Sequence, residues 1–470
     1  MTELYELTIS EAAEQLATGS ISALDLTQAT LDRITETEPV VHAYATVPAE
    51  AALNTARRVD SEIAAGNYRG TLHGIPIGVK DIIYTKDIAT EGGSHVLDGF
   101  VPTYDATVVE LLRGAGAIMI GKTACHEFAY GVNEPPTRTP WEMSCYPGGS
   151  STGSGVSLTM RSAPGTLGTD TGGSIRIPAA INGIVGLKPT YGRVSTFGVM
   201  PLSWSLDHVG PMTRTVKDNA ILLQVIAGHD PNDPNSARQT VPDFTADLES
   251  GVRGLRIGID RDYALYSGVI DDVRTAIESV VAEYEQMGAE IIAVSLPELE
   301  ITSETLFTIL LAEASTYHRQ MLREHGDKYD ATTRASLQLG ELVPATHYIT
   351  ALRARRLFRA AMVRLFEAER LNALLSPTMP LPTVPLSELH SPRTDMDIGE
   401  TPMISYIHHT FNANLTGQPA LSVPCGITSS GLPIGLQLLG RPFDEANLYR
   451  LAYAYEQAHD WYKRRPQIAH

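Results

Sequence analysis

Cysteine and positive charge are both scarce in this chain of 470 residues. The three cysteines, Cys125, Cys145 and Cys425, show no CxxC or Cys/His spacing, so we expect no disulfide framework, no zinc site and no other metal. Lys and Arg number 36 against 54 Asp and Glu, which gives a formal net charge of -18. Because this charge repels phosphates and anionic headgroups, the composition predicts no nucleic-acid partner and no membrane partner.

Long apolar runs and a basic leader are lacking as well. No apolar stretch reaches the roughly 18 residues that a membrane-spanning helix requires. The first residues, MTELYELTISEAAEQ, are acidic and amphipathic, unlike a signal peptide. We therefore expect a cytoplasmic protein. The hydrophobic content of 43% supplies enough material for a buried globular core.

The N-terminal segment, residues 1–66, has the pattern of helices. Thr8 and Glu11 form a capping box that predicts a helix start, because each side chain can bind the backbone N–H of the other. A second helix begins near Ser22, and we expect it to end before Pro39, since proline cannot continue the hydrogen-bond ladder. This part of the chain is predicted to be helical.

Further along, short apolar strands alternate with glycine-rich turns. The stretch from Leu255 to Leu296 reads as strand, helix and strand, and residues 303–370 as largely helical. A proline-rich segment at 376–393 predicts an ordered loop that borders a pocket. We predict one α/β domain over residues 1–470, with a catalytic core at 67–240 and the rest of the sheet, helices and pocket loops at 241–470.

The densest chemical signal lies between residues 145 and 178, where two glycine-rich turns carry serines. A serine nucleophile needs a tight backbone whose N–H groups converge on a developing oxyanion, and glycine allows that geometry. The turn from Thr171 to Ser174, with sequence Thr-Gly-Gly-Ser, has this character. A lone Gly-Gly-Ser is more often an ordinary turn. The assignment of Ser174 as a nucleophile therefore requires a base nearby.

Lys80 is the candidate base. It is the single positive charge within the apolar segment IPIGVKDII, which predicts partial burial. Burial disfavours the ammonium form and lowers the pKa, so a lysine there could accept a proton near neutral pH. A solvent-facing lysine at a strand end is the commoner case for such a pattern taken alone.

These segments, HGIPIGVKD, PGGSSTGSG and GTDTGGSIRIPAAINGIVGLKPTYGRVS, resemble the signature motifs of the amidase signature family. Further similarity extends from about residue 8 to about residue 458, and it is least specific between 240 and 375. The resemblance implies a three-layer α/β/α fold around a central mixed β-sheet. It also implies hydrolysis of a carboxylic amide through a seryl acyl-enzyme, without a cofactor.

Carried over by position, the resemblance implies a catalytic triad of Lys80 as base, Ser150 as bridging serine and Ser174 as nucleophile. The two serines are 24 residues apart, which fits the family. The family has a cis peptide next to its bridging serine, here Gly149-Ser150 or Ser150-Ser151. The resemblance also implies that the oxyanion donors are the backbone amides of Thr171, Gly172, Gly173 and Ser174. The supporting residues would be Ser151, Asp170 and Arg176.

Other motifs suggest different chemistry. Residues 116–123 fit GxxxxGK[ST], but the four intervening residues are an apolar run that reads as a strand, so a phosphate loop is disfavoured. Ser151 fits GxSxG and would need Asp207 and a histidine such as His409 as partners, yet no apolar strand precedes it. A thiol nucleophile at Cys125 or Cys145 is also weak, because most such cysteines are simply buried.

Within the family, the segment HEFAYG favours a free-standing amidase. The alternatives are the glutaminase subunit of a glutamyl-tRNA amidotransferase and a member that cleaves carbamates or esters. The expected partner is a small-molecule amide, and family analogy allows a homodimer. Tyr130 and Trp204 are candidate pocket residues. A non-enzymatic scaffold is disfavoured, because it leaves the buried lysine and the two serine turns unexplained.

Overall fold

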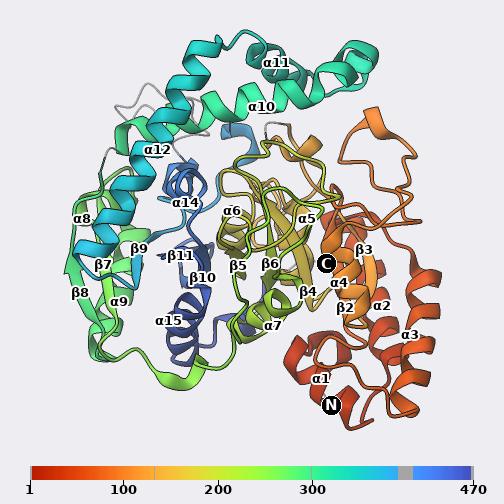
Figure 1. Cartoon of the computed structure of the whole chain (residues 1–470). Coiled ribbons are helices and arrows are strands. Elements are labelled where there is room, and N and C mark those ends of the chain that lie inside the picture. Colours follow the sequence, from red (N-terminus) through yellow and green to blue (C-terminus); the bar gives the residue numbers. More distant parts are fainter. Residues whose placement is uncertain (1–2, 132, 298, 390–405, 467–470) are drawn as a thin grey trace.

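The computed structural model describes residues 3–131, 133–297, 299–389 and 406–466. In this part of the chain one mixed sheet of 11 strands, in the order β1-β3-β2-β4-β6-β5-β10-β11-β9-β7-β8, runs through the molecule (Figure 1). The strands are β1 Tyr44–Thr46, β2 Pro76–Lys80, β3 Ile118–Thr123, β4 Gly165–Asp170, β5 Val185–Lys188, β6 His208–Thr213, β7 Arg256–Ile259, β8 Glu290–Ala293, β9 Ala373–Pro377, β10 Ala420–Ile427 and β11 Pro433–Gly440.

Helices cover both faces of this sheet. On β11, Gly435 faces Ala180 of α6, while Gly440 faces Leu448 of α15. Because strand residues an odd number of positions apart point to opposite faces, α6 and α15 lie on opposite sides. The helices are α1 Ile9–Ala17, α2 Ala23–Val41, α3 Ala49–Ala64, α4 Thr107–Gly114, α5 Thr152–Thr159, α6 Arg176–Asn182, α7 Val216–Ile226, α8 Arg261–Leu265, α9 Asp271–Gln286, α10 Thr302–His325, α11 Ala331–Gly340, α12 Ala345–Ala368, α14 Phe411–Thr416 and α15 Glu445–Gln457.

This architecture is the predicted three-layer α/β/α fold with a mixed central sheet. The helical N-terminus, the β7-α9-β8 unit with parallel strands, and the helices α10 to α12 all match the sequence patterns. The capping box at Thr8 and Glu11 is present in both directions. No helix in the described part of the chain is long and apolar enough to cross a membrane.

The predicted end of the second helix was wrong. Helix α2 continues through Pro39 and ends at Val41. Its C-cap residue, His42, has a left-handed backbone conformation. A proline removes one ladder hydrogen bond and crowds the preceding turn, a cost that matters most in the middle of a helix. Here Pro39 lies in the last turn, and the carboxylate of Glu38 accepts from the backbone N–H groups of Ala43 and Tyr44 just beyond it.

Strand order places the catalytic candidates at one edge of the sheet. β2 pairs in parallel with β4, with Val79 opposite Leu167, so the carboxyl ends of the two strands lie together. Lys80 is the last residue of β2, and Asp170 is the last residue of β4. The turn that follows β4 carries Ser174, so the lysine and this serine turn meet although they are far apart in the sequence.

Candidate functional site

Lys80 is buried at the centre of the site. Its side chain is 0% exposed, and its Nζ donates to Ser150 Oγ and to Thr169 Oγ1, each at 2.8 Å. Burial lowers the pKa of the Lys80 ammonium to about 8, because a charged amine is poorly solvated there. Among the described residues it has no ion-pair partner within 4.0 Å, so nothing in contact holds it permanently charged.

Ser150 lies in the turn that leads into α5. The peptide between Gly149 and Ser150 is cis, at one of the two positions that the resemblance implied. Gly149 is packed so tightly that a Cβ would lie 2.2 Å from Cε1 of His126 and 2.6 Å from the hydroxyl of Tyr146. The Ser150 carbonyl accepts from the His126 N–H at 3.2 Å. These contacts fix the backbone that presents the Ser150 hydroxyl to Lys80.

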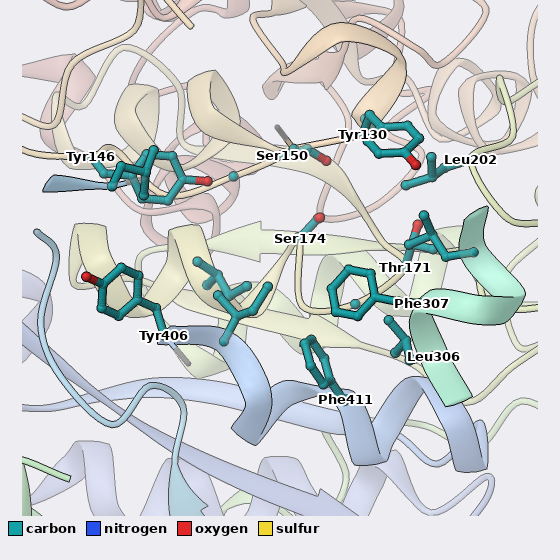
Figure 2. A pocket seen from close by; sticks show the side chains of 18 of the residues that line it. Tyr130, Tyr146, Ser150, Thr171, Ser174, Leu202, Leu306, Phe307, Tyr406 and Phe411 are labelled. Atoms are coloured by element: carbon teal, nitrogen blue, oxygen red, sulfur yellow. The ribbon is translucent and has the colours of Figure 1, made fainter. Parts of the chain in front are cut away.

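Ser174 lies in the turn between β4 and α6. Gly173 has a φ of +127, and a Cβ there would lie 2.4 Å from the hydroxyl of Thr410, so both the conformation and the space require glycine. In Figure 2 the Ser174 hydroxyl points across the cavity toward Ser150. No hydrogen bond joins these two hydroxyls among the described residues, so direct proton transfer between them requires that they come closer together.

The four predicted oxyanion donors are not equivalent. The Gly173 N–H donates to Asp170 Oδ1 at 2.8 Å and is already occupied. The amides of Thr171, Gly172 and Ser174 remain as candidate donors. The Asp170 carboxylate also accepts from the Ile175 N–H at 3.2 Å, so it holds the amides of Gly173 and Ile175 on either side of Ser174.

Asp170 and Arg176 form a buried ion pair beneath the turn. The Arg176 guanidinium donates to both carboxylate oxygens, with Nε to Oδ2 at 3.0 Å and Nη2 to Oδ1 at 2.9 Å. Burial alone would raise the pKa of the Asp170 carboxyl, but Arg176 holds it well below its ordinary value. Further acceptors of the guanidinium are the carbonyl of Thr410 and the side-chain oxygens of Asn414 and Gln437. The pair holds the loop and does not reach the cavity.

Asp207 supports the same turn from the other side. Its carboxylate accepts from Thr171 Oγ1 at 2.6 Å and from the backbone N–H groups of Leu202 and Ser203. Burial raises the pKa of this carboxyl to about 7, although these hydrogen bonds lower it. The contact links the oxyanion turn to Leu202 in the cavity wall.

A cavity of about 400 Å³ opens over the two serines. Tyr130 lines it together with Ser150, Thr171 and Ser174 (Figure 2). Trp204 lies elsewhere: its side chain is 41% exposed and borders two neighbouring hollows. The proline-rich loop contributes Pro382, Thr383 and Val384 to the wall, as its sequence predicted, while residues 390–393 of that segment lie outside the described residues.

The competing motifs receive little support. Ile118–Thr123 is strand β3, so its backbone is paired in the sheet and does not form a phosphate loop. Ser151 Oγ exchanges hydrogen bonds of 3.2 Å with the backbone of Thr169, which ties α5 to β4, and its hydroxyl is engaged there rather than with His409. Burial raises the pKa of the Cys125 thiol to about 12, which disfavours the thiolate.

Sequence reasoning missed two residues that shape the site, Thr169 and Thr410, and it named Asp207 only as a partner of Ser151, whereas its carboxylate binds Thr171. Thr169 is one position before Asp170 on a strand, so alternation does place its side chain on the face opposite to Asp170, where Lys80 lies. The alternation of side chains along this strand could therefore have predicted the position of Thr169. Thr410 contacts the turn from more than 200 residues away, and nothing in the local sequence indicates this contact.

The fold and the comparisons with known proteins define an amide hydrolase. The chain belongs to the amidase family, whose model matches residues 25–449. A glutamyl-tRNA(Gln) amidotransferase subunit from Myxococcus xanthus is 43% identical over 495 residues, covering 98% of this chain and 99% of the relative. The native peptide amidase of Stenotrophomonas maltophilia has 33% identity and a TM-score of 0.86, with 98% and 99% of the two chains covered. The corresponding amidotransferase subunit from Thermotoga maritima has 29% identity and a TM-score of 0.82, with 100% and 99% covered.

Two expectations from the sequence need correction. The prediction of a small-molecule amide as the sole partner, with no nucleic acid, is contradicted by these relatives, which are named as subunits of an amidotransferase for a transfer RNA. Net charge describes the whole surface and not a local binding face, which is why the inference failed. The preference for a free-standing amidase over an amidotransferase subunit is likewise not supported, since a short segment such as HEFAYG weighs less than identity over the full length.

Proposed function

We propose that this chain cleaves amide bonds through a seryl acyl-enzyme, with Ser174 as nucleophile, Ser150 as proton relay and Lys80 as base. The observation that carries the proposal is the 2.8 Å contact from Lys80 Nζ to Ser150 Oγ. The lysine is fully buried and its pKa is lowered to about 8, so a useful fraction is neutral near pH 7.

The first half of the reaction forms the ester. Neutral Lys80 takes the proton of the Ser150 hydroxyl while Ser150 takes the proton of Ser174. The Ser174 oxygen attacks the carbonyl carbon and forms a tetrahedral oxyanion. When the C–N bond breaks, the proton returns through Ser150 to the leaving nitrogen, which departs as ammonia or an amine.

The second half releases the acid. Water attacks the ester carbon and gives a proton to the relay, the bond from carbon to Ser174 breaks, and the serine recovers its proton. In both halves the amides of Thr171, Gly172 and Ser174 stabilise the oxyanion, each donor contributing on the order of 3 kcal/mol in comparable serine enzymes. The same ester would form from a carboxylic ester or a carbamate, so these are further candidate substrates.

Labelling with a fluorophosphonate tests the nucleophile directly. We expect the intact mass to rise by one adduct that maps to Ser174, and Ser174→Ala to lose both labelling and hydrolysis while its unfolding temperature stays close to that of the parent. Ser151→Ala is the matched control and should keep the label, because Ser151 Oγ is engaged with the backbone of Thr169 and has no other hydrogen-bond partner among the described residues. An adduct at Ser151 or Cys125 would contradict the assignment.

The relatives support a setting for this chemistry as the ammonia-releasing component of a tRNA-dependent amidotransferase. The support is identity of 43% and 41% over nearly the whole chain to relatives named as subunits of that enzyme. Glutamine would then be the amide, and glutamyl-tRNA together with further subunits the partners. Ammonia release from glutamine, measured for the chain alone and with the remaining subunits of a related amidotransferase, tests this setting. A large rise on assembly is the expected result.

One observation favours a second setting, hydrolysis of amides of apolar acids by the chain itself. None of the described residues that line the cavity is Asp, Glu, Lys, Arg or His. Glutamine brings an ammonium and a carboxylate into the site, and both need partners when they lose water. Release of the acid from an apolar amide by the purified chain would support this setting.

A further inference from the structure

The described residues that wall the cavity over Ser174 are mostly aliphatic and aromatic. They come from α10, α14, the turn before α6 and the proline-rich loop, which are widely separated in the sequence. Polar atoms are contributed by hydroxyl groups and by the backbone of the two serine turns. The arrangement of these walls limits which substrate groups the cavity can hold.

One part of the cavity, which we call the helical lobe, is formed by Leu306, Phe307 and Leu311 of α10 and Phe411 of α14. The rings of Phe307 and Phe411 meet edge to face, with centroids 5.6 Å apart. A Cβ on Gly172 would lie 3.6 Å from Leu306, so this lobe begins directly beside the oxyanion turn. Figure 2 shows Leu306, Phe307 and Phe411 on this side of Ser174.

A second part, the tyrosine lobe, is formed by Tyr146, Ile177, Met379, Val384 and Tyr406. Tyr146 stacks on His126 with ring centroids 5.8 Å apart, and its backbone N–H donates to the carbonyl of Val384 at 2.8 Å. In Figure 2 Tyr146 and Tyr406 lie on the side of Ser174 away from Phe307. The nucleophile therefore stands between two apolar lobes.

The chemistry of these lobes decides what they can hold. A charged group that enters either lobe loses water and finds no described side chain of opposite charge in the wall, which is unfavourable. An alkyl or aryl group loses only unfavourable contact with water and gains contact with the walls. The leaving group of a primary amide is ammonia, so such a substrate would fill one lobe and leave the other without a substituent.

We infer that the substrate is an N-substituted amide with an uncharged apolar group on each side of the scissile bond, one in each lobe. The inference rests on the proposed function, since it assumes that Ser174 attacks the carbonyl. The products are an apolar carboxylic acid and an apolar amine. Binding of both groups aligns the carbonyl between the two serines and the oxyanion turn.

A panel of four amides tests each side separately: phenylacetamide, N-benzyl phenylacetamide, glutamine and the γ-benzylamide of glutamate. Benzylamine and ammonia have similar basicity, so the leaving groups differ mainly in apolar surface. We expect kcat/KM for N-benzyl phenylacetamide to exceed that for phenylacetamide by at least about tenfold and that for glutamine by at least about 100-fold.

The results distinguish failure of the substrate inference from failure of the proposed function. If Ser174 takes up a fluorophosphonate but glutamine is the best of the four, or the benzyl group on nitrogen brings no gain, the inference fails and the proposed function stands. If Ser174 takes up no label and no amide is cleaved, the proposed function fails and the inference fails with it.

Variants that place a charge in one lobe sharpen the test. Leu311→Lys alters the helical lobe and Val384→Lys the tyrosine lobe, both at partly exposed positions. Each should lower kcat/KM for N-benzyl phenylacetamide by at least about tenfold, and one of them should spare phenylacetamide, because that substrate needs only one lobe. Leu342→Lys, at a side chain 75% exposed outside the cavity, is the matched control. An equal loss on both substrates in both variants would contradict the two-lobe assignment.

Discussion

Two buried lysines on neighbouring parallel strands, Lys80 at the end of β2 and Lys122 on β3, differ in what they face. Both side chains are 0% exposed, and burial lowers the pKa of both ammonium groups. Lys122 Nζ donates to the carbonyl of Ile83 and to the hydroxyl of Thr90, and it lies 3.9 Å from Asp81 Oδ1. Carbonyl and carboxylate oxygens only accept, so Lys122 serves as a donor and stays a structural cation.

Among the described residues, the hydrogen-bond partners of Lys80 Nζ are hydroxyl groups, which can both accept and donate, and it has no carbonyl or carboxylate partner like those of Lys122. One of these hydroxyls, that of Ser150, lines the cavity together with Ser174. Burial brings the pKa of either lysine close to neutral pH. Whether such a lysine can act as a base then depends on the groups that surround its nitrogen. The following predictions test this contrast.

Replacing the proposed base should have the largest effect. We expect Lys80→Met to lower kcat/KM by about 10,000-fold, because removal of one member of a catalytic triad usually costs that much. Circular dichroism and the unfolding temperature check that the fold persists, as Lys80 has no ion-pair partner among the described residues. Activity within tenfold of the parent would mean that another group deprotonates Ser174.

The pH profile of the parent should follow the charge on Lys80. The pKa is lowered to about 8, so below this value the ammonium form dominates and the base is lost. We expect kcat/KM to rise about tenfold for each pH unit up to about 8 and then to level off. A profile with its acid limb near pH 4 would indicate a carboxylate, and one with its limb near 6.5 a histidine.

Loss of the other lysine should affect stability more than turnover. Lys122→Met leaves Asp81 buried without its cation, and removal of one partner of a buried pair typically costs about 3–5 kcal/mol in the free energy of unfolding. Denaturant titration measures this loss. The kcat of the folded fraction should stay within about threefold of the parent, because Lys122 contacts neither serine. A loss comparable to that of Lys80→Met would abolish the distinction between the two lysines.

The smallest effect is expected at Thr169, whose hydroxyl accepts from Lys80 at 2.8 Å. Thr169→Val removes an acceptor that favours the ammonium form, so the pKa of Lys80 should fall further. We expect the midpoint of the pH profile to move down by about half a unit to one unit, since one unit corresponds to about 1.4 kcal/mol. The valine has a similar shape, so the unfolding temperature is the control. An upward shift would contradict the role assigned to this hydroxyl.

Local sequence predicted the elements around the site well, because glycine turns, capping residues and alternating strands are local features. Lys80, Ser150 and Ser174 could be named from their motifs, and the structure places Lys80 and Ser150 in contact. One detail could not be read locally: Trp204 lies outside the cavity over the serines.

Residue types and their spacing were enough to indicate the proposed chemistry, since a lysine in an apolar strand and two serines in glycine-rich turns are visible in the sequence. Tertiary structure alone decided the surroundings of that chemistry. Sheet order brings β2 beside β4, which supplies Thr169 to Lys80. Packing of α10, α14 and residues 379–384 against the two serine turns builds the lobes. These contacts join distant segments, and they depend on packing of whole elements rather than on any local pattern.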